Sequence, residues 1–353
     1  MSEEKELTRG EQLRRALVYE RKNGWDRLDA EEGAALEAYC TGYKQFLDAG
    51  KTERECVDRA IAQAEAAGFR AYVRGMELKP GDRIYQVNRD KAIMLAVMGR
   101  KGLEHGVNIG AAHIDSPRLD LKQNPLYESD ELGFFKTHYY GGIRKYQWVT
   151  IPLELHGVVA LKNGEVVRVS VGNGPDDPMF TIDDLLPHLA TDQVKKPLGE
   201  AIPAESLNIL VGSRPLRDDE GSDRVKLSVL ELLNRKYGIV EEDFLSAELC
   251  AVPAFRAVDI GFDRSLIGAY GHDDRVCAYA SLAALLQLGT PERTAVCMLA
   301  DKEEIGSEGV SGMKSRAFDT FMEDLCQSQS VPLRACYEKS FCLSADVTAA
   351  YDP

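Results

Sequence analysis

The chain has 353 residues, with 57 acidic and 43 basic side chains, a formal charge of −14 and 44% hydrophobic residues. Because 28% of the residues are charged and the apolar fraction is ordinary, the chain can bury a core, and a mainly disordered protein is excluded. The length predicts two domains, or one large domain with an insertion, and the negative charge excludes nucleic-acid partners.

The first 70 residues carry apolar side chains at helical spacing. We expect two or three amphipathic helices here, and Gly50 and Gly68 stand where C-terminal caps are expected. The apolar positions that define the pattern are Leu13, Leu17, Tyr19, Ala34, Leu36, Tyr39, Tyr43, Phe46, Leu47, Val57, Ile61 and Ala64.

Two short apolar runs follow, Ala92 to Met98 and Val107 to Ala112. Runs with little alternation predict strands covered on both faces, as in a sheet packed between helices. The polar segment from His113 to Pro117 comes directly after the second run. Its side chains should therefore lie at the end of a strand.

From about residue 119 to residue 258 the pattern changes to short alternating stretches punctuated by Gly and Pro. This pattern predicts a mainly β module with at least one helix. The expected strands are Thr150–Leu155, Val158–Leu161, Val166–Val171 and Leu207–Val211, and the expected helix is Asp223–Tyr237.

Helix and strand then alternate again, with a helix over Val276–Leu288 and strands over Thr294–Leu299 and Phe341–Ala345. The sequence therefore predicts one α/β domain interrupted by a β-rich insertion. The expected boundaries are 1–118 for the first part of the α/β domain, 119–258 for the insertion and 259–353 for the second part.

Three features of the chain indicate a cytoplasmic protein without a membrane partner. The residues from Met1 to Glu6 lack a basic region followed by an apolar core, and the longest apolar run, Ala92 to Met98, is too short to span a bilayer. The eight cysteines are dispersed, with no C-x-x-C pair, which indicates reduced and mostly buried thiols.

Polar clusters stand at the ends of the predicted elements. One imidazole and several carboxylates at the strand ends of an α/β sheet suit a divalent metal, because borderline cations take mixed nitrogen and oxygen ligands. A lone member of such a set is more often a helix cap or a solvated charge. Residues 301–304, however, follow a buried strand directly, which is a poor place for solvated charges. The clusters are His113 with Asp115, Asp273 with Asp274, Glu303 with Glu304, and Asp346.

Neighbouring carboxylates can take different roles at a metal site. One of Glu303 and Glu304 can bind metal while the other acts as general base. Asp115, two residues after His113 on an extended segment, can approach the same ligands. A bridging carboxylate from the Asp273-Asp274 pair would complete a two-metal arrangement.

Five motifs occur in the order and rough spacing of one metallopeptidase family. The chain resembles the aspartyl aminopeptidase and vacuolar aminopeptidase I family of zinc aminopeptidases, in the bacterial branch named probable aminopeptidase 1. The resemblance covers essentially the whole chain and implies a helix-flanked mixed sheet of the zinc-exopeptidase kind. The motifs are Gly110–Leu119, Tyr139–Ile143, His272–Val276, Asp301–Glu308 and Ser344–Asp346.

The resemblance implies two zinc ions, which cobalt or manganese can replace in vitro. It implies that His113 and Asp346 bind one zinc, that Glu304 binds the other and that Asp273 bridges both. In the family the bridging aspartate is commonly followed by Asn. Here it is followed by Asp274, and position favours Asp273 as the bridge.

The resemblance also implies the catalytic roles. Glu303 would be the general base, and Asp115 would orient the His113 side of the site. His188, in the segment from Ile182 to Leu189, would enter the active site of a neighbouring subunit. The implied reaction is hydrolysis of the N-terminal residue, acidic or neutral, from peptides with a free N-terminus.

The resemblance implies an assembly as well. The β-rich insertion would mediate dimers that build a tetrahedral dodecamer, with Gly141, Gly142 and Trp148 near its contacts. The family pattern continues beyond Asp346 and supplies a final histidine to the zinc held by Glu304. We therefore expect a catalytic domain that is incomplete and a second zinc that binds weakly.

Two alternatives remain at this stage. One is a carboxypeptidase or deacylase on the same metal scaffold, which would need a basic group to recognise a carboxylate. The other is a catalytically impaired, truncated or assembly form that binds without turnover.

Overall fold

The structure is a computed structural model that describes residues 7–218 and 220–351. The described residues of Met1–Tyr43 and of Lys44–Pro353 form separate compact units. All of the candidate site residues lie in the second unit. The first unit holds α1 (Arg9–Leu17), the 3-10 helix η1 (Trp25–Arg27) and most of α2 (Ala30–Ala49).

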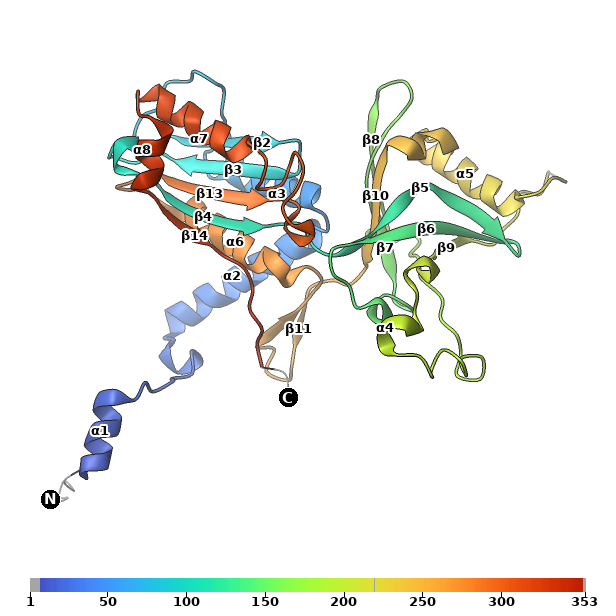
Figure 1. Ribbon diagram of the computed structural model, residues 1–353, viewed down its shortest axis with the longest axis horizontal. Coiled ribbons are helices and arrows are strands. Elements are labelled where there is room, and N and C mark those ends of the chain that lie inside the picture. The colour runs from blue at the N-terminus through green and yellow to red at the C-terminus, as the bar shows by residue number, and fades with distance from the viewer. Residues whose placement is uncertain (1–6, 219, 352–353) are drawn as a thin grey trace. The chain divides into compact units, whose positions relative to one another are not determined.

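A mixed sheet forms the centre of the layer that carries most of the candidate site residues (Figure 1). Its strand order is β1-β2-β3-β13-β4-β14, and β4 runs parallel to both of its neighbours. All six residues of β3 are buried, as its continuous apolar run predicts. The strands are β1 (Arg70–Ala71), β2 (Arg83–Asn88), β3 (Ala92–Val97), β4 (Asn108–His113), β13 (Ala295–Ala300) and β14 (Phe341–Ser344).

Helices cover both faces of this sheet, α7 and α8 on one side and α3 and α6 on the other (Figure 1). Met94 and Met298 of the sheet share a buried cluster with Phe321 and Leu325 of α7. The predicted helix-flanked mixed sheet is therefore confirmed. Among the described residues, no helix combines the length and the apolar character needed to cross a bilayer. The helices are α3 (Glu53–Ala66), α6 (His272–Gln287), α7 (Ala317–Ser328) and α8 (Leu333–Glu338).

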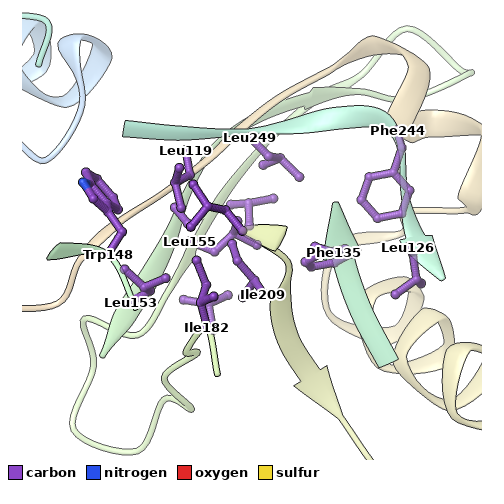
Figure 2. Close-up of a cluster of buried hydrophobic side chains, with 14 of the residues drawn as sticks. Leu119, Leu126, Phe135, Trp148, Leu153, Leu155, Ile182, Ile209, Phe244 and Leu249 are labelled. Carbon is purple, nitrogen blue, oxygen red and sulfur yellow. The ribbon is translucent and has the colours of Figure 1, made fainter. Parts of the chain in front are cut away.

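A second sheet, antiparallel throughout, is formed by residues between β4 and α6. Its order is β8-β7-β10-β5-β6-β9, and its apolar face carries a buried core that includes Leu119, Phe135, Leu155 and Phe244 (Figure 2). The strands are β5 (Arg118–Ser129), β6 (Leu132–Tyr140), β7 (Leu153–Ala160), β8 (Val166–Val171), β9 (Ile209–Gly212) and β10 (Ala247–Pro253).

The remaining elements are short, apart from α5. The insertion boundaries 119–258 predicted from the sequence stay a proposal, as do the flanking ranges 1–118 and 259–353. The elements are α4 (Leu198–Ala201), α5 (Arg224–Tyr237), the hairpin β11 (Val258–Ile260) and β12 (Leu266–Gly268), and the 3-10 helices η2 (Leu103–His105), η3 (Lys145–Gln147), η4 (Ala204–Ser206), η5 (Glu241–Ser246) and η6 (Glu303–Ile305).

Several elements differ from the sequence prediction. The expected strands Thr150–Leu155 and Val158–Leu161 overlap a single strand, β7, because Gly157 continues the ladder at a point where a Cβ would lie 1.9 Å from a carbonyl oxygen of β10. The hairpin of β5 and β6 was not singled out, because a register shift after Leu121 interrupts its alternation. Helix α7 was missed although its buried apolar residues have helical spacing.

The cysteines follow the prediction from composition. All eight are free thiols, and five of them are buried.

Candidate metal centre

His113 ends strand β4 and supplies the imidazole of a group that it forms, among the described residues, with Asp273 and Asp346. The residue is 4% exposed, and its Nδ1 lies 3.0 Å from the backbone oxygen of Asp115 and 3.2 Å from Oδ1 of the same residue. An N–H at Nδ1 that donates to Asp115 fixes the ring orientation and leaves Nε2 for another ligand, as in histidines that bind metals. Burial opposes the charged form, but the hydrogen bond and charge of Asp115 raise the pKa of His113 to about 9.

Three carboxylates face Nε2 of His113. Asp273 Oδ1 lies 3.2 Å away, Glu303 Oε2 3.8 Å and Asp346 Oδ1 4.0 Å. Glu303 and Asp346 follow β13 and β14, the two parallel neighbours of β4, so their strand ends converge at one edge of the sheet. Asp273 comes from the start of α6, which packs on β4.

The donor set fits a zinc ion. Nε2 of His113 is buried and has no hydrogen-bond partner among the described residues, and once its proton is released it can bind a metal ion. One ligand atom each from His113, Asp273 and Asp346 lies within 4.8 Å of the others. One imidazole nitrogen and carboxylate oxygens are ligands that zinc takes in proteins.

Asp115 connects the histidine to the Glu303-Glu304 turn. It is fully buried, its Oδ1 accepts a hydrogen bond from the Glu303 backbone N–H at 3.2 Å, and its Oδ2 accepts one from the Glu304 N–H at 3.2 Å. The hydroxyl of Tyr140 donates to the same Oδ2 at 2.6 Å. Burial opposes ionisation, but the hydrogen bonds from His113 and Tyr140 hold the pKa of Asp115 below its usual value.

Glu304 lies on η6 beside Gly141. A Cβ built on Gly141 would be 3.1 Å from the Glu304 Cβ and 3.2 Å from Oε2, so the glycine lets the two segments approach. Burial, together with the charge of Asp273, raises the pKa of Glu304 to about 7. Carboxylates crowded in this way are stabilised by a bound cation.

The two aspartates at the start of α6 have different surroundings. Asp273 is half-exposed and directs its carboxylate at His113, whereas Asp274 is fully buried and its pKa is raised by burial. The Ser116 hydroxyl donates to the backbone oxygen of Asp273 at 2.7 Å. The geometry therefore brings Asp273, rather than Asp274, to the histidine.

A cavity of about 300 Å³ opens beside His113, Glu303 and Asp346. Small and flexible side chains complete its lining, Ser307 and Met313 among them.

The structure also places three residues that do not belong to the group His113, Asp273 and Asp346. His188 is exposed, lies between β8 and α4, and is not among the residues that line the cavity or surround His113. Sequence reasoning missed the contacts of Tyr140 and Gly141, although both belong to the motif Tyr139–Ile143. Their place in that motif was the available signal.

Known proteins are similar to this chain over most of its length. The family described as aminopeptidase I zinc metalloprotease (M18) matches residues 46–353. A relative from Clostridium acetobutylicum, named probable M18 family aminopeptidase 1, is 47% identical over 345 residues, which cover 96% of this chain and 74% of the relative.

Solved structures give the same result for the fold. The crystal structure of an M18 family aminopeptidase from Thermotoga maritima matches with a TM-score of 0.89 at 42% identity, covering 95% of this chain and 74% of that chain. The mApe1 dodecamer of S. cerevisiae matches with a TM-score of 0.72 at 20% identity, covering 90% of this chain and 74% of that chain.

Proposed function

This chain belongs to the aminopeptidase I (M18) family of zinc metalloproteases, and we propose that it removes the N-terminal residue from peptides at two zinc ions, with Glu303 as the general base. The observation that carries the proposal is the buried Nε2 of His113, which faces the carboxylates of Asp273, Glu303 and Asp346.

The donor set supports a division between two ions. His113 and Asp346 would hold one zinc, Glu304 the other, and Asp273 would bridge them, with cobalt or manganese as replacements in vitro. When bound, zinc supplies Lewis-acid activation of water and polarisation of the scissile carbonyl. The raised pKa of Glu304 supports its place, since the crowded carboxylates need a cation.

Glu303 would carry the proton. Its carboxylate takes a proton from the attacking water and gives it to the leaving amine. This role is supported by a side chain that is 48% exposed and lies 3.8 Å from the histidine, so that it reaches the cavity. Asp115 accepts a hydrogen bond from the Glu303 backbone N–H and thereby fixes the backbone position from which the Glu303 side chain extends.

The free N-terminal amine of a peptide would be recognised by charge. A protonated amine can make charge-assisted hydrogen bonds to the carboxylates at this edge of the sheet. An acylated amine carries no charge and cannot make them. The cavity would take the side chain of the N-terminal residue, acidic or neutral.

A substrate panel tests the proposed reaction. Aminoacyl chromogenic substrates with a free amine and their N-acetylated counterparts are offered with zinc, cobalt or manganese. Hydrolysis restricted to the free-amine set supports the aminopeptidase. Turnover of the acetylated set favours the deacylase or carboxypeptidase alternative, and zinc binding without turnover indicates an assembly form.

The assembly is a proposal of its own. We propose that the β-rich module forms dimers that build a tetrahedral dodecamer, with His188 reaching the site of a neighbouring subunit. The shared fold with the S. cerevisiae mApe1 dodecamer supports an oligomer. Native mass spectrometry measures the oligomer, and the variant His188→Ala should lose turnover while it keeps zinc. The cytoplasmic location stays a prediction.

A further inference from the structure

Tyr140, at the end of a strand of the second sheet, brings a hydroxyl to Asp115, which follows the end of β4 in the first sheet. It ends strand β6, is 7% exposed and donates to Asp115 Oδ2 at 2.6 Å. Since Asp115 also accepts from the N–H groups of Glu303 and Glu304, one carboxylate joins Tyr140 to the turn that carries both glutamates.

The ring of Tyr140 packs against the guanidinium of Arg118. Arg118, its cross-strand partner on β5, places its guanidinium 4.0 Å from the ring centroid. Arg118 is itself fixed, because it donates to Glu53 at 2.9 Å and to Asp120 at 2.8 Å. A cation over a ring and two charge-assisted hydrogen bonds leave the phenol little freedom to turn.

The phenol is a permanent donor. Burial and the neighbouring charge of Asp115 raise the pKa of Tyr140 above its usual range, so the hydroxyl keeps its proton at physiological pH. Without that hydroxyl, Oδ2 of Asp115 would keep only the Glu304 N–H at 3.2 Å. A buried carboxylate that loses its shortest hydrogen bond is free to rotate, and it would carry the imidazole of His113 with it.

We propose that Tyr140 is a positioning residue, which fixes Asp115 and through it the His113 imidazole and the Glu303-Glu304 turn. The proposal rests on the proposed zinc aminopeptidase function. It gives a residue of the second sheet a role in the geometry of the metal centre at the edge of the first sheet.

The test compares two neighbouring tyrosines. Tyr140→Phe removes only the hydroxyl and keeps the ring over Arg118, whereas Tyr139→Phe is the matched control, because Tyr139 is 40% exposed and stacks on His138. Each variant is also made in an Asp115→Ala background. The measurements are zinc affinity by chelator competition, kcat and KM at saturating zinc, and the melting temperature.

We expect Tyr140→Phe to weaken zinc binding and to lower kcat by about 10- to 100-fold, the range found when groups behind metal ligands are removed. KM should match that of Tyr139→Phe, and the melting temperature should fall by only a few degrees, because one buried hydrogen bond is lost. In the Asp115→Ala background, Tyr140→Phe should change zinc affinity by less than about twofold, because its partner is gone.

Two results would overturn the proposal. One is zinc affinity and kcat for Tyr140→Phe equal to those of Tyr139→Phe. The other is an equal loss of zinc affinity with and without Asp115, which would show that Tyr140 acts independently. If the wild-type chain binds zinc but lacks aminopeptidase activity, the proposed function fails, and the zinc measurements still decide the role of Tyr140.

Discussion

Gly141 is the position where a single added methyl group should disturb the metal centre most directly. Its φ is +70°, a left-handed conformation, and a Cβ there would lie 3.1 Å from the Cβ of Glu304, 3.2 Å from its Oε2 and 3.5 Å from Cγ of Pro117. The substitution Gly141→Ala therefore combines backbone strain with a contact that only a shift of Glu304 relieves.

The two effects have different sizes. A side chain in the left-handed conformation costs about 1–2 kcal/mol, so we expect the free energy of unfolding to fall by that amount. For a chain of 353 residues this corresponds to a melting temperature lower by roughly 1–3 °C. A shift of Glu304 by a few tenths of an ångström should also lower kcat, by roughly tenfold, because catalytic geometry tolerates little displacement.

Gly142→Ala is the matched control, since a Cβ there meets nothing within 4 Å and its φ is not left-handed. Thermal unfolding of both variants is followed with chelator and with zinc, and kcat is measured at saturating zinc. The backbone strain of Gly141→Ala should lower its melting temperature both with chelator and with zinc. Only Gly141→Ala, and not Gly142→Ala, should lose kcat. Equal melting temperatures and equal kcat for the two variants would refute the reasoning.

Two further predictions concern the cavity and a buried ion pair. Met313→Arg places a cation beside the cavity and should raise the ratio of kcat/KM for acidic to kcat/KM for neutral N-terminal residues by roughly tenfold. The control is Met179→Arg, at an exposed position that does not line the cavity. An equal change of this ratio in both variants would contradict the prediction. Burial opposes the charge of His156, but hydrogen bonds and charges of Glu154 and Glu55 raise its pKa to about 9. Its contribution to stability is complete below the unfolded-state pKa of about 6.5 and is lost as the pH rises through about 9. Urea unfolding should therefore show a smaller decline over this window in His156→Gln than in the wild type, and equal declines would count against the pair.

Local patterns predicted the parts of the fold that neighbouring residues determine. The run Ala92 to Met98 indicated β3 because continuous burial leaves a continuous apolar sequence. The spacing of His113 and Asp115 likewise indicated their contact, because it depends on a few residues of extended chain. The helix Asp223–Tyr237 was confirmed within one residue for the same reason.

Contacts between distant segments were beyond such patterns. Tyr140 reaches Asp115 only through the register of β5 and β6, and Gly141 meets Glu304 across 163 positions of sequence. No periodicity specifies which glycine must approach which carboxylate. The motif that holds both residues was visible, but its physical meaning required the packing of two sheets.

The most direct test of the central claim is the turnover of Glu303→Gln at measured zinc content. The substitution keeps the shape of the side chain and removes its ability to accept the proton. Glu308→Gln is the control, because Glu308 follows on the same segment and pairs with Lys314 on the surface.

We predict that Glu303→Gln retains the zinc content of the wild type and loses at least about 100-fold in kcat toward free-amine substrates, while Glu308→Gln keeps both. A Glu303→Gln variant with full zinc and undiminished kcat would contradict the account.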